Sequence, residues 1–272
     1  MTLAHLLVNL VVSVAAVALT MLATMAYALR TGVQSVIDTV WGLGFVGVAI
    51  VSFVTSHVLA EGVLGDGLDA RRVIVLALTA IWGVRLGVYI HRRNHGKGED
   101  PRYAALMRKN TGPVVPYVIR KIYWPQGALM WVVSLPVQVA MYETAPLGIV
   151  TWIGVAVWVF GFTFESVGDL QLSRFKADPA NAGKVMDRGL WAWTRHPNYF
   201  GDATVWWGLF LLACSHWAGV LTVVSPIVMT HLLVNWSGKA LLERRMARSR
   251  GPEYADYLAR TSGFLPRPPR RV

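Results

Sequence analysis

The chain has 272 residues, of which 54% are hydrophobic and 15% are charged, and its formal net charge is +11. Soluble domains carry roughly 25% charged residues, so this composition excludes a disordered chain and argues against an ordinary cytosolic enzyme. The single cysteine, Cys214, cannot form an internal disulfide, which excludes a secreted disulfide scaffold.

Seven apolar segments approach the roughly 20 residues that a membrane-spanning helix needs. Pro125 and Pro136 interrupt the fourth segment, which membrane helices tolerate when neighbours satisfy the freed carbonyls. The first segment is too long for a signal sequence and lacks a basic leader, so we keep it as a span. The segments cover residues 3–29, 34–58, 73–91, 117–141, 147–168, 202–215 and 217–237.

This pattern predicts an all-α polytopic membrane protein with about seven transmembrane helices. We expect residues 1–272 to form a single membrane-embedded domain, with the first three helices in 1–91 and helices four to seven in a cytoplasm-facing half, 92–272. No internal repeat or long soluble domain interrupts it.

The Lys and Arg residues indicate the orientation. If the N-terminus lies outside, 23 of the 26 fall on the cytoplasmic side, in Arg30, 92–121, 170–201 and the tail from 238. Because positive residues favour cytoplasmic loops, we predict an N-terminus outside and a C-terminus inside, in the bacterial inner (plasma) membrane. Topology then explains the net charge, and we expect no nucleic acid partner.

Two places within or at the end of apolar segments carry ionisable residues and are candidates for a functional site, because charge in a bilayer is costly. Asp38 shares a helical face with Gln34; the alternative is that it only joins two helices. Arg85, Tyr89 and Arg92 form a stripe towards the cytoplasm; the alternative is an interfacial tyrosine with topology-setting arginines.

The loop after the third segment mixes acids, bases and a phenol rather than forming a plain basic flank. Arg offers a bidentate fork to phosphate, so this loop could bind a phosphorylated ligand. Its polar residues are Lys97, Glu99, Asp100, Arg102 and Tyr103.

Glu165 and Asp169 lie four residues apart, so two carboxylates share one helical face, with Arg174 about a turn later. Such a pair needs a cationic or hydroxyl-rich partner. Ribose hydroxyls, an amide or arginines from a neighbouring loop would serve, and a purely structural salt bridge is the alternative.

The densest polar segment lies between residues 189 and 208, just before an apolar helix. Pro197 suits a helix first turn and Gly201 permits close backbone approach. We expect no metal here, and no glycine-rich phosphate loop follows a strand. The polar residues are Arg195, His196, Asn198, Tyr199 and Asp202.

The motif GLWxxxRHPNYFGD, preceded by ESxxDxQLxxF and followed by ERRM and YxxYLxRTSGFLP, resembles a known family over roughly residues 34–266. It is similar to the bacterial uncharacterised branch of the steroid 5α-reductase superfamily. That superfamily includes the sterol C14-reductases and is related to the isoprenylcysteine and phospholipid methyltransferases.

The resemblance implies NADPH bound in the cytoplasm-facing half. Tyr89-Ile90-His91-Arg92 matches a stretch that supplies a catalytic tyrosine and a phosphate-binding arginine, and Asp38 stands where the family has a glutamate that pairs with that tyrosine. Asn198 and Asp202 match one cofactor-binding pair, and Glu165 with Asp169 matches another, with Glu165 departing from the family's Asn. The implied cofactor ligands are Arg92, Arg93, Arg102, Glu165, Asp169, Arg174, Arg195, His196, Asn198, Tyr199, Asp202, Lys239 and Glu243.

The expected function is NADPH-dependent reduction of an activated carbon–carbon double bond in a membrane-soluble lipid or steroid-like enone that enters from the bilayer. Tyr89 would donate to the substrate carbonyl oxygen and Asp38 would orient Tyr89. One alternative is an S-adenosylmethionine-dependent lipid methyltransferase, because that branch shares RHPxY. A non-enzymatic lipid receptor is another. Substrate identity and oligomeric state stay open.

Overall fold

The computed structural model describes residues 3–60, 67–143, 145–236 and 239–270. Over these residues the regular elements are all helices, which confirms the all-α prediction, and one isolated bridge joins Thr194 to Ser262. The helices of the first part are α1 (Leu3–Thr31), α2 (Val36–Ala60), α3 (Gly67–Asn94), α4 (Pro101–Met107), α5 (Val114–Val118), η1 (Ile119–Tyr123), α6 (Trp124–Val133) and α7 (Leu135–Ala140). The second part has α8 (Ile149–Ala177), η2 (Pro179–Asn181), α9 (Leu190–Trp193), α10 (Pro197–Ala213), α11 (Trp217–Val220), η3 (Leu221–Val223), α12 (Val224–His231), η4 (Leu232–Trp236) and α13 (Lys239–Arg260).

The chain divides into two compact units. Unit 1 comprises Met1–Gly148 and Leu212–Thr222, and unit 2 comprises Ile149–Leu211 and Val223–Val272. The division predicted after residue 91 falls within unit 1, and a single embedded domain over the whole chain stays a prediction. Each unit is described separately below.

Five helices of the described residues are long and apolar enough to cross a membrane, which supports a membrane protein. They are Leu3–Thr31, Val36–Leu59, Ala70–Asn94, Ile149–Ala177 and Trp217–Trp236. The other two predicted segments differ for clear reasons. Residues 117–141 are divided among short helices, with Pro125 and Pro136 in the first turns of α6 and α7. Helix α10 has 17 residues, about 25 Å, which is shorter than the roughly 30 Å hydrocarbon core.

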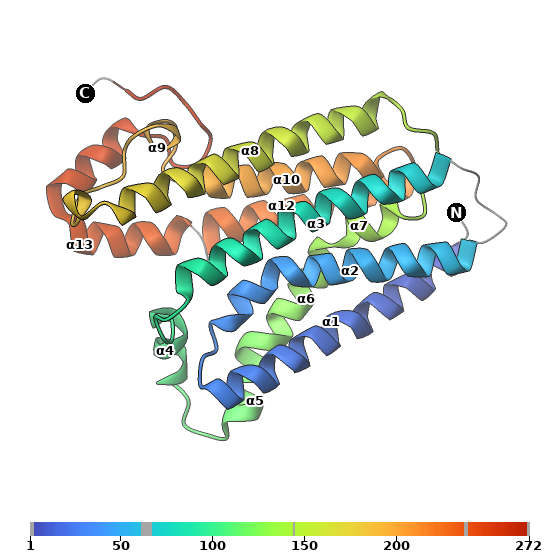
Figure 1. Ribbon diagram of the computed structural model, residues 1–272, viewed down its shortest axis with the longest axis horizontal. Coiled ribbons are helices and arrows are strands. Elements are labelled where there is room, and N and C mark those ends of the chain that lie inside the picture. The colour runs from blue at the N-terminus through green and yellow to red at the C-terminus, as the bar shows by residue number, and fades with distance from the viewer. Residues whose placement is uncertain (1–2, 61–66, 144, 237–238, 271–272) are drawn as a thin grey trace. The chain divides into compact units, whose positions relative to one another are not determined.

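In unit 1, α1, α2 and α3 run side by side in alternating directions (Figure 1). Helices α2 and α3 touch through their backbones, because a Cβ on Gly42 would lie 2.5 Å from the carbonyl oxygen of Gly83. A Cβ on Gly44 would collide with Met130 of α6, whereas one on Gly47 would meet nothing within 4 Å. Small residues at such crossings let membrane helices approach closely.

Arg71, fully buried in the first turns of α3, fastens three parts of unit 1 together. Its guanidinium donates to the carbonyl oxygen of Leu212 (2.7 Å), to Ser215 Oγ (2.9 Å) and to the carbonyl oxygens of Ala145 and Pro146 (3.0 and 3.1 Å). Backbone carbonyls thus solvate a charge that has no access to water. Arg71 therefore has a structural role in unit 1.

A buried polar network joins α1, α2 and α7 of unit 1. Ser13 Oγ donates to Gln138 Oε1 (2.6 Å), and Gln138 Nε2 donates to Ser134 Oγ (2.8 Å). Asn9 Nδ2 also donates to Ser52 Oγ (3.3 Å). Hydrogen bonds between helices fix their rotation about their own axes, since each polar side chain must face its partner.

In unit 2, α8 and α10 are joined by glycines that face each other's backbone. A Cβ on Gly161 would lie 2.7 Å from the amide nitrogen of Val205, and a Cβ on Gly208 would lie 2.7 Å from that of Trp158. A Cβ on Gly201 would collide with the backbone of Glu165. The close crossing therefore brings the acidic stretch of α8 next to the polar start of α10.

The glycine crossing of unit 1 can be tested with two substitutions on one helix. Gly42→Ala should lower the free energy of unfolding by about 1–3 kcal/mol, because the new methyl group displaces the backbone of α3. Gly47→Ala is the matched control and should stay within about 1 kcal/mol of the wild type. Thermal unfolding of both variants in the same detergent measures the difference, and equal behaviour would contradict the crossing.

Candidate functional site

Three carboxylates are buried at the crossing of α8 and α10 in unit 2. Glu165 is 2% exposed, Asp169 is 3% exposed and Asp202 is 7% exposed. Asn198 Nδ2 donates to Asp169 Oδ1 at 3.2 Å. Acids buried among apolar helices are costly and mark candidate functional sites. Gly201 sets the start of α10 against the backbone of Glu165, and we call Glu165, Asp169, Asn198 and Asp202 the acidic cluster below.

The local sequence around Pro197 sets the start of α10 against α8, next to the acidic cluster. Helix α10 begins at Pro197, whose fixed φ suits a first turn. A Cβ on Gly168 would lie 3.1 Å from the Pro197 ring and 3.3 Å from the amide nitrogen of Asn198, so the glycine lets the start of α10 rest on α8. The rings of His196 and Tyr199 stack with 5.3 Å between centroids.

Arg195 connects the start of α10 to α13. Its Nε donates to Glu243 Oε1 (2.8 Å), and His196 Nε2 lies 3.2 Å from the same oxygen. Its Nη1 also donates to the carbonyl oxygens of Leu258 (3.2 Å) and Thr261. Burial alone would raise the pKa of Glu243, but hydrogen bonds from His196 and Arg195 outweigh it and lower that pKa to about 2.

The segment after α13 hydrogen-bonds to Thr194 and to the backbone of Arg195. Thr194 Oγ1 donates to the carbonyl oxygen of Phe264 (2.8 Å), and the amide of Arg195 donates to the carbonyl oxygen of Ser262 (2.9 Å). Phe264 packs edge-on against Phe200 of α10. The RTSGFLP motif is thus a support for the RHPNYFGD motif.

In unit 1, Asp38 lies in a cluster with the loop after α3. Tyr103 Oη donates to Asp38 Oδ1 (2.7 Å), and Arg102 Nη2 donates to Asp38 Oδ2. Arg102 Nε also donates to Asp100 Oδ1 (2.9 Å), and Gln126 Nε2 donates to Tyr103 Oη (3.3 Å). Burial, followed by the charge of Asp38, raises the pKa of the Tyr103 phenol well above its usual range, so this hydroxyl is a neutral donor.

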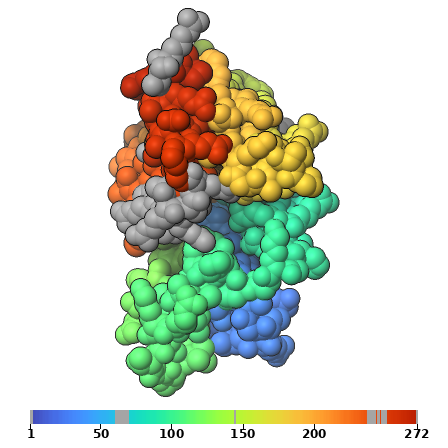
Figure 2. Space-filling model, turned by 90° about the vertical axis from the view of Figure 1, so that its left-hand side faces the viewer, coloured from blue at the N-terminus to red at the C-terminus, as the bar shows by residue number. Residues whose placement is uncertain are grey.

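Glu99 docks the same loop onto the start of α2. Its carboxylate accepts from the backbone amides of Ser35 (2.9 Å) and Gln34, as a negative group does at a helix N-terminus. Tyr123 Oη donates to Gln34 Oε1 (2.8 Å). Figure 2 shows this loop and α4, teal to green, beside the blue segment that joins α1 to α2.

Tyr89 is half-buried on α3 with guanidinium groups on either side, Arg85 at 6.0 Å and Arg93 at 5.9 Å from its ring centroid. A Cβ on Gly87 would lie 3.2 Å from the carbonyl oxygen of Thr39, so Tyr89 and Asp38 are at similar levels of the α2–α3 pair. The pairing of Asp38 with Tyr89 stays a prediction.

The structure puts a different tyrosine, Tyr103, on Asp38, and sequence reasoning missed it. Tyr103 was noted only as part of a possible phosphate-binding loop. The sequence offered one signal for it: Tyr103 follows Arg102 in the loop after the Tyr89 stripe. Helical spacing could not connect Tyr103 to Asp38, which lies 65 positions earlier in the chain.

Three of the remaining predicted ligands are exposed arginines. Arg92 and Arg93 are exposed in the last turn of α3, and Arg174 is exposed in the last turn of α8. The side chain of Lys239 lies outside the described residues. Among the described residues, no three His, Cys, Asp or Glu side chains are arranged so that they could hold a metal ion.

Two comparisons with known proteins place the chain among relatives. The model of a family described as protein of unknown function (DUF1295) matches residues 24–261, which include the acidic cluster and Asp38. An uncharacterized protein of Schizosaccharomyces pombe is 24% identical over 244 residues, which is 78% of this chain and 68% of the relative.

The Glu243 contacts predict a pH dependence of stability. The pKa of Glu243 is about 2 in the folded protein and about 4.3 in an unfolded chain, so its carboxylate stabilises the fold fully above pH ~4.3. This contribution is lost as the pH falls towards 2. The stability difference between wild type and Glu243→Gln should therefore be largest near neutral pH and shrink over that window.

Thermal unfolding at a series of pH values measures this difference. Asp256→Asn, an exposed acid on the same helix, is the control and should follow the wild type throughout. A Glu243→Gln variant whose deficit stays constant down to pH 2 would refute the assignment.

Proposed function

This chain belongs to the DUF1295 family, within the steroid 5α-reductase-like superfamily, and on that premise we propose an NADPH-dependent reductase. Its reaction is the reduction of an activated carbon–carbon double bond in a lipid or steroid-like enone dissolved in the membrane. The observation that supports this most is the acidic cluster of unit 2. Three buried acids on two apolar helices are costly and mark a functional site, and Asn198 donates to one of them, Asp169.

The hydrogen-bonding groups of the acidic cluster fit the nicotinamide half of NADPH. Glu165, Asp169 and Asp202 offer acceptors for ribose hydroxyls and a carboxamide, and Asn198 offers a donor and an acceptor. The phosphates suit arginines, of which Arg174 is exposed at the end of α8. When bound, NADPH supplies the hydride.

Arg92 and Arg93 are assigned to phosphate binding by the same reasoning, because both guanidinium groups are exposed. Arg102 and Arg195 are assigned differently. Arg102 already donates to Asp38 and Asp100, and Arg195 to Glu243 and two carbonyls. We therefore propose that these two position the loops that carry the other ligands.

Tyr89 is proposed as the donor to the substrate carbonyl oxygen, where negative charge develops during hydride addition. The guanidinium groups of Arg85 and Arg93 near its ring stabilise that charge. Asp38 holds Tyr103 directly, which makes Tyr103 the second candidate donor. Helices that exclude water strengthen each of these interactions.

We also propose seven spans, formed by the five long helices together with the segment 117–141 and α10, with the N-terminus outside. The charge of unit 1 supports this orientation. Nine of its Lys and Arg residues lie at the end where α1 finishes and α3 finishes, and Arg71 and Arg72 lie buried at the other end. We place the protein in a bacterial inner membrane.

Titration of the purified protein with NADPH tests the cofactor. Asn198→Ala should raise the dissociation constant of NADPH at least tenfold, because the acidic cluster loses its amide donor. Asn110→Ala, in the loop after α4, is the matched control and should bind like the wild type. Tight S-adenosylmethionine binding without NADPH binding would contradict the reductase and favour a methyltransferase.

Two tyrosine substitutions test the donor, with a 3-oxo-Δ4 steroid as the probe enone. Tyr89→Phe should lower turnover by about 10²–10³ and leave the NADPH dissociation constant within a few-fold. Tyr103→Phe should keep most of the turnover, since its hydroxyl is directed at Asp38. The opposite result would move the donor role to Tyr103, and loss of NADPH binding by Tyr89→Phe would remove Tyr89 from it.

A further inference from the structure

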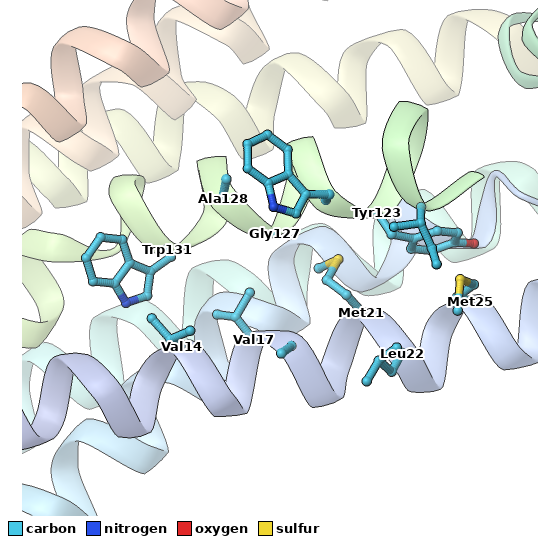
Figure 3. A pocket seen from close by; sticks show the side chains of 12 residues that line it. Val14, Val17, Met21, Leu22, Met25, Tyr123, Gly127, Ala128 and Trp131 are labelled. Carbon is cyan, nitrogen blue, oxygen red and sulfur yellow. The ribbon is translucent and has the colours of Figure 1, made fainter. Parts of the chain in front are cut away.

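A groove in unit 1 runs between α1 and the η1–α6 segment (Figure 3). Its volume is about 400 Å³. Figure 3 shows Val14, Met21 and Met25 on α1 facing Tyr123 and Trp131 on the other side. We call it the α1–α6 groove.

The shape of the α1–α6 groove suits one extended hydrocarbon chain. From Val14 to Met25 the helix rises about 17 Å, so the volume of about 400 Å³ is spread along a narrow channel. Small side chains, Ala18 and Ala128, line it where bulkier ones would close it. Both alanines are exposed, so the groove opens onto the surroundings of the helices.

Two polar groups of the groove wall, the Tyr123 hydroxyl and the Trp131 indole N–H, are already hydrogen-bonded within unit 1. Tyr123 Oη donates to Gln34 Oε1 (2.8 Å), and Trp131 Nε1 donates to Ser13 Oγ (3.0 Å). A substrate carbonyl would find these donors engaged. The groove therefore favours a purely apolar occupant over a polar enone.

The end of the groove near Met25 is bordered by cations. Arg30 lies in the last turn of α1, about 7 Å along the helix from Met25. Arg120 and Lys121 follow the groove residue Ile119 directly on η1. All three side chains are exposed.

No carboxylate on these elements balances the three cations. Neither α1 nor residues 102–142 contains Asp or Glu. The preceding acids point elsewhere, since Glu99 accepts from the start of α2 and Asp100 accepts from Arg102. Clusters of Lys and Arg beside membrane helices bind anionic lipid headgroups.

We propose that the α1–α6 groove binds one acyl chain of an anionic phospholipid whose phosphate contacts Arg30, Arg120 and Lys121. The apolar channel takes the chain and the cationic border takes the headgroup. This site is independent of the proposed reductase activity. Its occupant is a lipid of the surrounding bilayer and not the enone.

Native mass spectrometry of the full chain in detergent tests the proposal, with phosphatidylglycerol and phosphatidylcholine of identical acyl chains as probes. The wild type should retain one phosphatidylglycerol at least tenfold more strongly than phosphatidylcholine. Combined Arg30→Gln, Arg120→Gln and Lys121→Gln should abolish this preference. Arg108→Gln with Lys109→Gln, two exposed cations after α4, is the control and should keep it.

A second pair of variants tests the apolar channel. Ala18→Trp fills the groove from its exposed wall and should lower retention of both lipids at least tenfold. Ala15→Trp, exposed on α1 outside the groove, should retain lipid like the wild type. Thermal unfolding of all variants verifies that each is folded.

Equal retention of the two lipids by the wild type would overturn the proposal, and so would unchanged phosphatidylglycerol retention by Ala18→Trp. The proposal would also be overturned if a neutral lipid were recovered with the wild type, were lost from Ala18→Trp, and were not displaced by added phosphatidylglycerol. That last result would make the groove a substrate site. Each outcome is separable from catalysis, because NADPH takes no part in the measurement.

Discussion

The site depends on one kind of interaction: each carboxylate among the apolar helices is stabilised by a neighbouring hydrogen-bond donor or cation. Asp169 has Asn198, Asp38 has Tyr103 and Arg102, and Glu243 has Arg195 and His196. A buried anion without such a partner would be protonated or would destabilise the fold. Each acid therefore dictates where a polar loop must dock, and the glycine crossing of α8 with α10 supplies the proximity that the acidic cluster requires.

The helices could be predicted from sequence because apolar length is a local property. The hydropathy that marks residues 3–29 corresponds closely to α1, and that of 147–168 corresponds to the first two thirds of α8, which continues to Ala177. Where the prediction is too coarse, backbone chemistry explains the difference. Pro125 and Pro136 lie in the first turns of α6 and α7 within 117–141, and each lacks the amide that a regular helical hydrogen bond would use. The division into two discontinuous units has no counterpart in the sequence pattern, because it depends on which distant segments pack.

Only those parts of the site could be predicted in which polar residues lie close together along the sequence or are regularly spaced on one helix. The RHPNYFGD motif was located because five polar side chains precede an apolar helix, and Glu165 with Asp169 follow from helical spacing. The contacts of Arg195 with Glu243, of Glu99 with the start of α2 and of Tyr103 with Asp38 join residues between 48 and 65 positions apart. The spacing of residues along one helix indicates a face and not the partner it meets. Arg195 was predicted as a phosphate ligand for this reason, although its side chain is engaged by α13 and the segment after it.

The four-acceptor clamp of Arg71 has a consequence for biogenesis. Two of its acceptors, the carbonyl oxygen of Leu212 and Ser215 Oγ, are synthesised more than 140 residues after the arginine itself. While the ribosome is still making α8 and α10, the guanidinium at the start of α3 lacks half of the oxygens that surround it in the finished protein. Closure of the first unit is thus a late event in translation, and a chain interrupted before residue 212 would display an incompletely coordinated cation to the membrane insertion and proteolysis machinery.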